Sequence, residues 1–212
     1  DKMLEVIKNN QDKKEFRCID KIELKKYNEP DKVVKDMEIV KCNTNIPKMA
    51  YTIKVNIDKF KMDERRLSIY MYVIFNLLFG DTTKFDEEAK REGIITSSLY
   101  YNILDIGSHF VISLINSTDK YESLIEKIEN EFKNIKFSES DLERKKKVLI
   151  SNEVFSYENI EMVNEMIIDN VIFDGRIEED IIDIINSLNM EELMSVVSKI
   201  DFDNKSIVIL KK

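Results

Sequence analysis

Hydrophobic and polar residues alternate one by one along residues 49–58, and this period of two is typical of a half-buried β-strand. The segment from Met37 to Cys42 alternates in the same way, though less regularly. We therefore predict a strand over residues 49–57, with residues 37–42 as a neighbouring strand. The apolar positions of the stronger alternation are Met49, Tyr51, Ile53, Val55 and Ile57.

The following segments have the period of amphipathic helices. Asp63 is a suitable N-cap, and apolar residues then recur at spacings of three and four up to Gly80. Thr82 or Thr83 can cap a second helix that ends at Gly93. Because each helix stops at a glycine, we predict a left-handed backbone at both Gly80 and Gly93. The apolar stripe of the first helix is Leu67, Tyr70, Met71, Ile74, Leu77 and Leu78.

A β-hairpin and another helix are predicted after Gly93. Residues 94–104 and 110–115 are rich in Ile, Leu, Tyr, Phe and Val, and residues 105–108 have the composition of a hairpin connection. Thr118 or Asp119 is expected to begin the helix. Its apolar stripe, the most regular in the chain, is Tyr121, Leu124, Ile125, Ile128, Phe132 and Ile135.

A long helical pattern begins near residue 138. Ser140 and Glu143 have the spacing of a capping box, and the pattern continues to Ile172 with a break near Ser156. Residues 174–175 are expected to end it.

A short helix is then predicted over residues 178–188. Asn189 and Glu192 have the spacing of a second capping box, which opens another helix. Residues 205–210 are predicted to form the last strand.

The predicted elements of residues 37–212 follow the order β-β-α-α-β-β-α-α-α-α-α-β. Strands meet through hairpins and helices come in runs. This segregation predicts an α+β fold of two layers, in which an antiparallel-rich sheet carries helices on one face. Residues 1–36 are interpreted as the end of a preceding domain followed by an inter-domain linker.

Charge narrows the range of partners. The net charge is −8, with 33 basic and 41 acidic residues interspersed. Phosphate binding needs a basic face, so we expect no nucleic-acid partner. The basic run at residues 144–147 lies within a helical pattern and is interpreted as a solvated helix face. The longest apolar stretch, residues 69–79, is too short to span a bilayer, so we expect no membrane partner.

Cys18 and Cys42 are the only cysteines of the 212-residue chain, and two do not make a disulfide framework. Reduced thiols are typical of a reducing compartment, and we therefore expect a cytoplasmic protein.

The chain has one histidine, His109. A catalytic zinc site needs at least two imidazoles or thiolates in fixed register, as in H-E-x-x-H or the inverted H-x-x-E-H, and neither motif occurs here. Cys18, Cys42 and His109 have no ligand-like spacing. We expect no metal site within this chain.

His109 is interpreted as a histidine at the end of a strand. The alternative is a Ser-His-Asp relay with Ser108 or Ser113 and Asp105, but no G-x-S-x-G motif accompanies these residues. No catalytic residue is predicted.

Residues 97–102 combine small polar residues with two adjacent tyrosines, Tyr100 and Tyr101. In a strand these two side chains face opposite sides of the sheet, so one is expected in the core and the other exposed. An exposed phenol suits contact with a peptide. We predict Ser98, Tyr100 and Tyr101 as substrate contacts; the alternative is that the tyrosines are ordinary cross-strand residues.

The order of these pieces resembles a known family. The carrying segments are "IPKMAYTIKVN", "RRLSIYMYVIFNLLFGDTTKFDEEAKREGII", "SLYYNILDIGSHFVISL" and "SESDLERKKKVLISNEVFSYENIEMVNEMIIDNVIFDG". Together they are similar to the second, non-catalytic half-domain of the pitrilysin/insulinase peptidases, which are zinc enzymes with the H-x-x-E-H motif. The bacterial processing-peptidase-like members are the most similar.

The resemblance implies a division of labour. In this family a zinc-bearing half and a related half without zinc close around an unfolded peptide. This chain is then expected to form one wall of the peptide chamber and to be inactive in isolation. Zinc is expected in a homologous partner half, either upstream in the same chain or in a partner subunit.

The chain departs from the family at two positions. Several members have a substrate-binding Tyr directly after the glycine that corresponds to Gly93, and an Arg before it. Here Ile94 follows Gly93, and Glu87 stands at the position of the Arg. The resemblance therefore implies no transition-state role for this chain. Two other functions stay open: a scaffold subunit without proteolytic activity, or an unrelated soluble α+β binding module.

Overall fold

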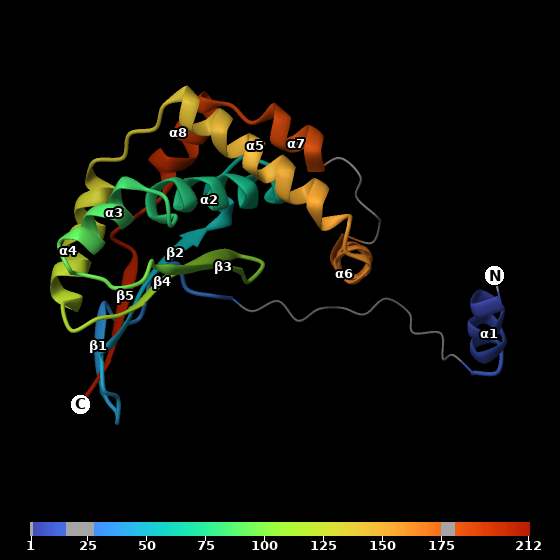
Figure 1. Ribbon diagram of the computed structural model, residues 1–212, viewed down its shortest axis with the longest axis horizontal. Coiled ribbons are helices and arrows are strands. Elements are labelled where there is room, and N and C mark those ends of the chain that lie inside the picture. The colour runs from blue at the N-terminus through green and yellow to red at the C-terminus, as the bar shows by residue number, and fades with distance from the viewer. Residues whose placement is uncertain (1, 16–27, 175–180) are drawn as a thin grey trace.

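A computed structural model describes residues 2–15, 28–174 and 181–212 (Figure 1). The strands are β1 (Met37–Lys41), β2 (Lys48–Asn56), β3 (Tyr100–Asp105), β4 (His109–Ser117) and β5 (Lys205–Lys211). The helices are α1 (Lys2–Gln11), η1 (Ile57–Lys59), α2 (Glu64–Phe79), α3 (Lys84–Arg91), α4 (Tyr121–Lys133), α5 (Glu139–Ser156), α6 (Ile160–Asp169), η2 (Asn170–Asp174), α7 (Ile181–Ser187) and α8 (Met190–Lys199).

The five described strands form one sheet in the order β1-β5-β2-β4-β3. The prediction that residues 37–42 neighbour β2 is wrong, because β5 lies between β1 and β2. Only the β1–β5 pair is parallel, and the other three pairs are antiparallel. From β1 onward the strands and main helices follow the predicted order, and the predicted two-layer α+β class is confirmed. In Figure 1 the helices α2, α3, α5, α7 and α8 gather on one side of the sheet.

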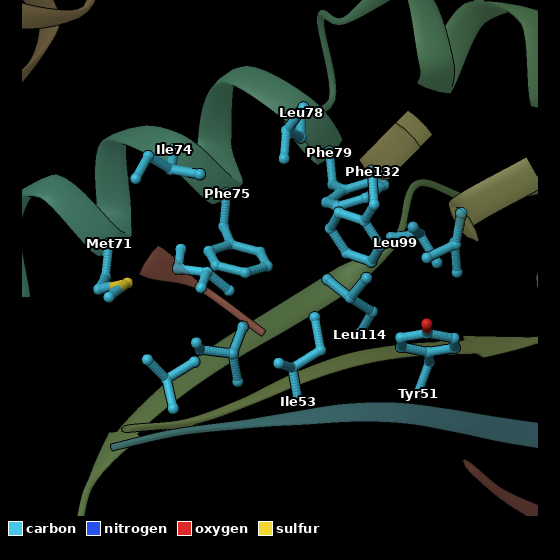
Figure 2. Packing of buried hydrophobic residues seen from close by; sticks show 14 of the residues in the cluster. Tyr51, Ile53, Met71, Ile74, Phe75, Leu78, Phe79, Leu99, Leu114 and Phe132 are labelled. Atoms are coloured by element: carbon cyan, nitrogen blue, oxygen red, sulfur yellow. The ribbon is translucent and has the colours of Figure 1, made fainter. Parts of the chain in front are cut away.

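The core lies between this side of the sheet and the helices. Strand β2 contributes Tyr51 and Ile53, and helix α2 contributes Phe75 and Phe79, all of them completely or almost completely enclosed. Phe132 of α4 closes the end of this layer, with its ring centroid 5.3 Å from that of Phe79 (Figure 2). The alternating pattern of β2 and the stripes of α2 and α4 are thus the residues that build the core, as predicted.

The two glycines that end α2 and α3 serve different purposes. Gly93 has φ +64°, and the amides of Gly93 and Ile94 donate to the carbonyls of Lys90 and Ala89, which is the Schellman arrangement. The left-handed prediction is therefore confirmed at Gly93. It is wrong at Gly80, where φ is −63°. A Cβ on Gly80 would lie 2.6 Å from the carbonyl oxygen of Asn76, so this position requires glycine for space.

The predicted strand over residues 94–104 is wrong in its first part, because β3 begins only at Tyr100. The amides of Ile94 and Ile95 both donate to Ala89 and still complete the end of α3. Further on, the carbonyls of Ser97 and Ser98 accept hydrogen bonds from the Asn116 side chain instead of a strand.

The capping box of α5 also differs from the prediction. It joins Ser138 and Asp141, not Ser140 and Glu143, because Ser138 is the last residue with an extended backbone before the helix. Asn189 caps α8 by accepting from the Glu192 amide, which confirms the predicted N-cap. The reciprocal half of the predicted capping box is wrong, because the Glu192 carboxylate binds Arg66 and Tyr70 and the Asn189 amide donates to Tyr70. Of the short helix predicted over residues 178–188, residues 178–180 lie outside the described residues.

Helix α1 has no buried residue, and the predicted domain boundary at residue 36 stays a prediction. No helix among the described residues combines the length and apolarity needed to cross a bilayer.

Candidate functional site

The side of the sheet opposite the helices is only half covered. Because side chains alternate along a strand, the register assigns every second residue to this surface, which we call the open face. At one end of this face Lys54 and His109 are buried beneath residues 29–31, and none of its other residues is buried, in contrast to the enclosed residues between them. The open face consists of Tyr100, Asn102, Leu104, Val111, Ser113, Ile115, Ala50, Thr52, Ser206, Val208 and Leu210.

The open face mixes hydroxyl groups with exposed apolar side chains. Thr52 and Ser113 lie side by side on β2 and β4, and their hydroxyl oxygens are 3.0 Å apart. Tyr100 is 64% exposed and Leu104 is 52% exposed, both on β3. Strand β3 ends the sheet, and among the described residues it pairs only with β4. Its outer edge therefore has backbone groups that are free to pair with another chain.

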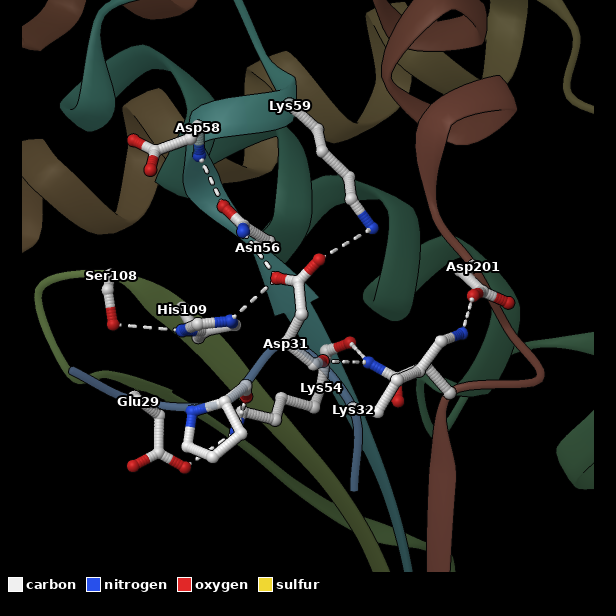
Figure 3. Close-up of polar contacts among 12 residues, drawn as sticks. Glu29, Asp31, Lys32, Lys54, Asn56, Asp58, Lys59, Ser108, His109 and Asp201 are labelled. Atoms are coloured by element: carbon white, nitrogen blue, oxygen red, sulfur yellow. Dashed lines mark hydrogen bonds and ion pairs between the residues drawn. The ribbon is translucent and has the colours of Figure 1, made fainter. Parts of the chain in front are cut away.

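One end of the sheet is closed by the segment before β1 (Figure 3). Asp31 accepts hydrogen bonds from Asn56 and pairs with His109, whose Nε2 lies 3.2 Å from its Oδ1. The hydrogen bond from Asn56 is the main reason why the pKa of Asp31 is below its ordinary value, and His109 contributes next. The Lys54 amine likewise binds Glu29 at 2.6 Å. These contacts fasten residues 29–31 over β2 and β4.

His109 does have a serine and an aspartate as neighbours, but the aspartate is not the predicted one. Its Nδ1 lies 2.8 Å from the Ser108 hydroxyl, while its Nε2 faces Asp31. Asp105 instead accepts the Gly107 amide in the hairpin, and Ser113 pairs with Thr52. The relay through Asp105 or Ser113 is therefore wrong, and the His109 side chain, only 3% exposed, fastens the segment around Asp31.

The three predicted contact residues lie on different sides of β3. Tyr100 points to the open face, whereas Tyr101 points to the helices, as the alternation requires. The Tyr101 hydroxyl accepts a hydrogen bond of 2.7 Å from the Asn76 amide, and burial raises the pKa of Tyr101 to about 12. Ser98 lies beside α3, where its hydroxyl accepts a 2.7 Å hydrogen bond from Lys90.

Two shallow depressions meet at Tyr101 along this edge of the sheet. One has a volume of about 270 Å³ and the other about 460 Å³. The second brings Ser98, Tyr100 and Tyr101 together at its rim, although their role as substrate contacts stays a prediction. The first is lined by Ser68, Tyr72, Tyr101, Asn102, Ile103, Asp105 and Phe110, and the second by Asn76, Phe79, Gly80, Asp81, Ser98, Leu99, Tyr100 and Tyr101.

The residues do not fit a zinc ion. Within residues 2–15, 28–174 and 181–212, no three His, Cys, Asp or Glu side chains lie close enough together to hold a metal. Both nitrogens of His109 face other side chains, and Cys42 is a half-exposed free thiol. Cys18 lies outside the described residues. No catalytic step through a metal is derived for this chain.

The prediction of a solvated basic face at residues 144–147 is wrong at two residues. The Lys146 side chain is 11% exposed and donates to the Leu188 carbonyl. Lys145 was predicted on a solvated helix face, yet it is only 7% exposed and lies on the inner side of α5. Leu142 is three residues before it and Leu149 four residues after it, and both pack in or against the core. This spacing places Lys145 on the apolar stripe of the helix, and it was the signal that could have identified the position.

Glu87 and Ile94, which stand at the positions of the family's Arg and Tyr, differ in exposure. Glu87 is exposed on α3, while Ile94 is half-buried in the turn after Gly93. The Ile94 carbonyl accepts a 2.6 Å hydrogen bond from Thr118, so this residue has a structural role at the end of α3.

No family model matches the sequence. No curated protein matches it either. Solved structures do match the fold. A protein described as an M16-like peptidase, from Alicyclobacillus acidocaldarius, superposes with a TM-score of 0.85 at 16% identity, over 99% of this chain and 51% of its own. A protease from Helicobacter pylori gives 0.80 at 15% identity, over 100% of this chain and 52% of its own.

A third similar structure is described as an inactive domain of an M16 peptidase from Pseudomonas fluorescens, with a TM-score of 0.62 at 15% identity over 89% of this chain and 46% of its own. This chain thus has the fold of M16 peptidase domains, the group of pitrilysin and insulinase, and inactive domains share that fold. The resemblance noted in the sequence is confirmed at this level. The chain spans about half the length of these structures.

Proposed function

We propose that this chain is the zinc-free half of a pitrilysin/insulinase-type zinc endopeptidase, and that it forms one wall of the chamber that holds the peptide substrate. The observation that carries the proposal is the open face, a half-exposed sheet surface that ends in the unpaired edge of β3, on a fold shared with M16 peptidase domains.

An unfolded peptide has two needs that this surface can meet. Its backbone amides and carbonyls need partners, and the outer edge of β3 offers a row of them, so the peptide can add to the sheet as a further strand. Its side chains need a surface that tolerates many sequences. Tyr100 and Leu104 offer apolar contact, and the hydroxyls of Thr52 and Ser113 offer hydrogen bonds.

The zinc ion belongs to a homologous partner half in this proposal, upstream in the same chain or in a partner subunit. The residues described here supply no ligand cluster for it, so they hold and orient the peptide instead. The cysteine usage supports a cytoplasmic location. A scaffold related to such peptidases is the second candidate, because an inactive M16 domain has the same fold.

Peptide binding tests the wall. A fluorescein-labelled peptide of apolar and hydroxyl residues, with an amidated end, is titrated with the 212-residue chain and followed by anisotropy. Leu104→Ala removes an exposed aliphatic side chain from the open face and is expected to weaken binding about fivefold, since partial burial of the removed carbons contributes about 1 kcal/mol. Ile160→Ala is the matched control, because Ile160 is 83% exposed on α6. Equal effects of the two substitutions contradict the proposed wall.

Cleavage tests the division of labour. The chain alone should not hydrolyse the labelled peptide with or without added zinc, whereas the chain together with its zinc-bearing half should. Zinc-dependent cleavage by this chain alone contradicts the proposal. If the complete assembly binds the peptide but does not cleave it, the chain is a scaffold related to such peptidases.

A further inference from the structure

We propose that Lys145, Tyr72 and Tyr101 form a carboxylate-binding site beside strand β3, which selects peptides that carry a negative charge. The inference rests on the proposed function, because it names the chemical class of peptide that the wall prefers. It is carried by a lysine amine that has no hydrogen bond or ion pair with a described residue, and by two adjacent tyrosine hydroxyls that together keep one proton to donate.

Lys145 is the first donor. Its side chain reaches from α5 over Tyr72 of α2, and its Nζ lies 5.2 Å from the ring centroid. Although Lys145 is only 7% exposed, its amine has no hydrogen bond or ion pair with any described residue. The amine is not among the fully enclosed polar atoms that lack a partner, so solvent still reaches it. A cation that is nearly enclosed and accessible from one side is suited to an anion.

The two tyrosines are the other donors. Their ring centroids are 6.2 Å apart, and Tyr101 lines both depressions along β3. The Tyr101 oxygen accepts the hydrogen bond from Asn76, and its hydrogen bond with Tyr72 uses one of the two phenol protons, so the pair keeps one proton for an acceptor. Tyr72 lines the smaller depression, is 37% exposed, and shares a hydrogen bond with the Tyr101 hydroxyl.

The surrounding charges leave the cation uncompensated at short range. Asp81 in the larger depression attracts Lys145 from beyond ion-pair distance, and Asp105 lines the smaller one. Arg144 is adjacent in sequence but faces Asp141, at 3.5 Å. Burial, followed by the charge of Arg144, lowers the pKa of Lys145. A ligand that brings its own negative charge relieves this cost.

A carboxylate matches the site because it only accepts hydrogen bonds and can take two donors on its two oxygens. In a peptide along β3 it can come from a free C-terminus or from an Asp or Glu side chain. Both sources present the same group, and three labelled peptides separate them: a neutral peptide with an amidated end, the same sequence with a free C-terminus, and an amidated version with one central Glu.

The test measures the dissociation constants of the three peptides for the 212-residue chain by anisotropy at physiological salt. At least one carboxylate peptide should bind about tenfold more tightly than the neutral one, as a charge-assisted hydrogen bond predicts. Lys145→Met, similar in volume and without charge, should abolish this preference and leave the neutral peptide unaffected. Tyr101→Phe should reduce the preference severalfold.

Lys147→Met is the matched control. Lys147 is exposed on the same helix, and its substitution changes the net charge by the same amount, so it should keep the preference. Thermal melting of each variant confirms that it is folded. Equal binding of all three peptides to the wild type overturns the carboxylate site but leaves the peptide wall intact. If Lys145→Met and Lys147→Met both lose the preference for carboxylate peptides, the preference is due to net charge and the site is overturned. If none of the three peptides binds, both the peptide wall and the carboxylate site are overturned.

Discussion

Two tyrosines of the core, Tyr51 on β2 and Tyr70 on α2, are both completely enclosed but differ in the partners of their hydroxyl groups. The Tyr70 hydroxyl donates to Glu192 at 2.7 Å and accepts from the amide of Asn189 at 3.0 Å. The Tyr51 hydroxyl has no hydrogen-bond partner among the described residues. Substitution of each tyrosine by phenylalanine removes the same atom from the same core, and we expect effects of opposite sign.

The magnitudes follow from the cost of an unpaired group. A buried polar group without a hydrogen bond costs about 1–3 kcal/mol, because water satisfies it in the unfolded chain. Tyr51→Phe removes this cost and is expected to raise the free energy of unfolding by about 1 kcal/mol, the lower end of that range. Tyr70→Phe deprives Glu192 and the Asn189 amide of a partner and should lower it by about 1–2 kcal/mol.

Urea denaturation followed by circular dichroism measures both differences in the free energy of unfolding. The melting temperatures should move in opposite directions, by about 2–4 °C per kcal/mol for a chain of this size. The pair is its own control, since both substitutions have the same change in volume. If Tyr51→Phe destabilises the protein as much as Tyr70→Phe does, the Tyr51 hydroxyl has a partner in solution and the reasoning is refuted.

Two further substitutions test the cap of α3 and the burial of Lys145. Gly93→Val should lower the free energy of unfolding by about 1–2 kcal/mol, because a left-handed residue with a Cβ is strained, and Gly93→Asn should cost less; equal melting temperatures for Gly93→Val and wild type contradict the cap. Lys145→Met should be more stable than wild type near neutral pH. Because burial lowers the pKa of Lys145 in the folded state, the unfolded chain binds more protons between that pKa and about 10.5, and wild-type stability should rise with pH through this window. Urea denaturation at a series of pH values should show the gap between the two proteins narrowing toward pH 10.5, and a constant gap contradicts it.

The elements with a strong period were predictable because their patterns are created by burial on one side. Strand β2 has the helices on one face and the open face on the other, so its sequence alternates. Helix α4 covers the end of the core with one stripe, which includes Leu124, Ile128 and Phe132. Both were located from these stripes alone. The start of β3 was not, because apolar residues such as Ile95 and Leu99 are equally buried in a turn whose backbone is held by side chains.

The candidate site was harder to predict because its residues meet only in three dimensions. Asp31 and His109 are 78 residues apart, and the sequence around either residue does not indicate that the two are in contact. Tyr100 and Tyr101 were found from their adjacency, and their opposite directions follow from the strand. Lys145 was missed because the run of four basic residues at 144–147 was interpreted by its charge. The spacing of Lys145 from Leu142 and Leu149 instead places it on the inner stripe of the helix.

The two faces of the sheet are consistent with the proposed role of a peptide-binding wall, because they separate the residues that stabilise the fold from those that are available for contact. Stability comes from the face that packs on α2, α4 and α8, where the enclosed residues gather. The open face contributes little burial, so its sequence is free to serve contact with another molecule. An edge strand whose only requirement is to stay soluble typically has charged side chains. The edge strand β3 instead presents Tyr100 and Leu104 on the open face, and Lys145 and Tyr72 lie with Tyr101 on its other side. Apolar contact and a free edge on β3, with the Lys145 cation of α5 beside it, are together what the proposed binding of a charged, extended peptide requires, and no metal is needed for any of them.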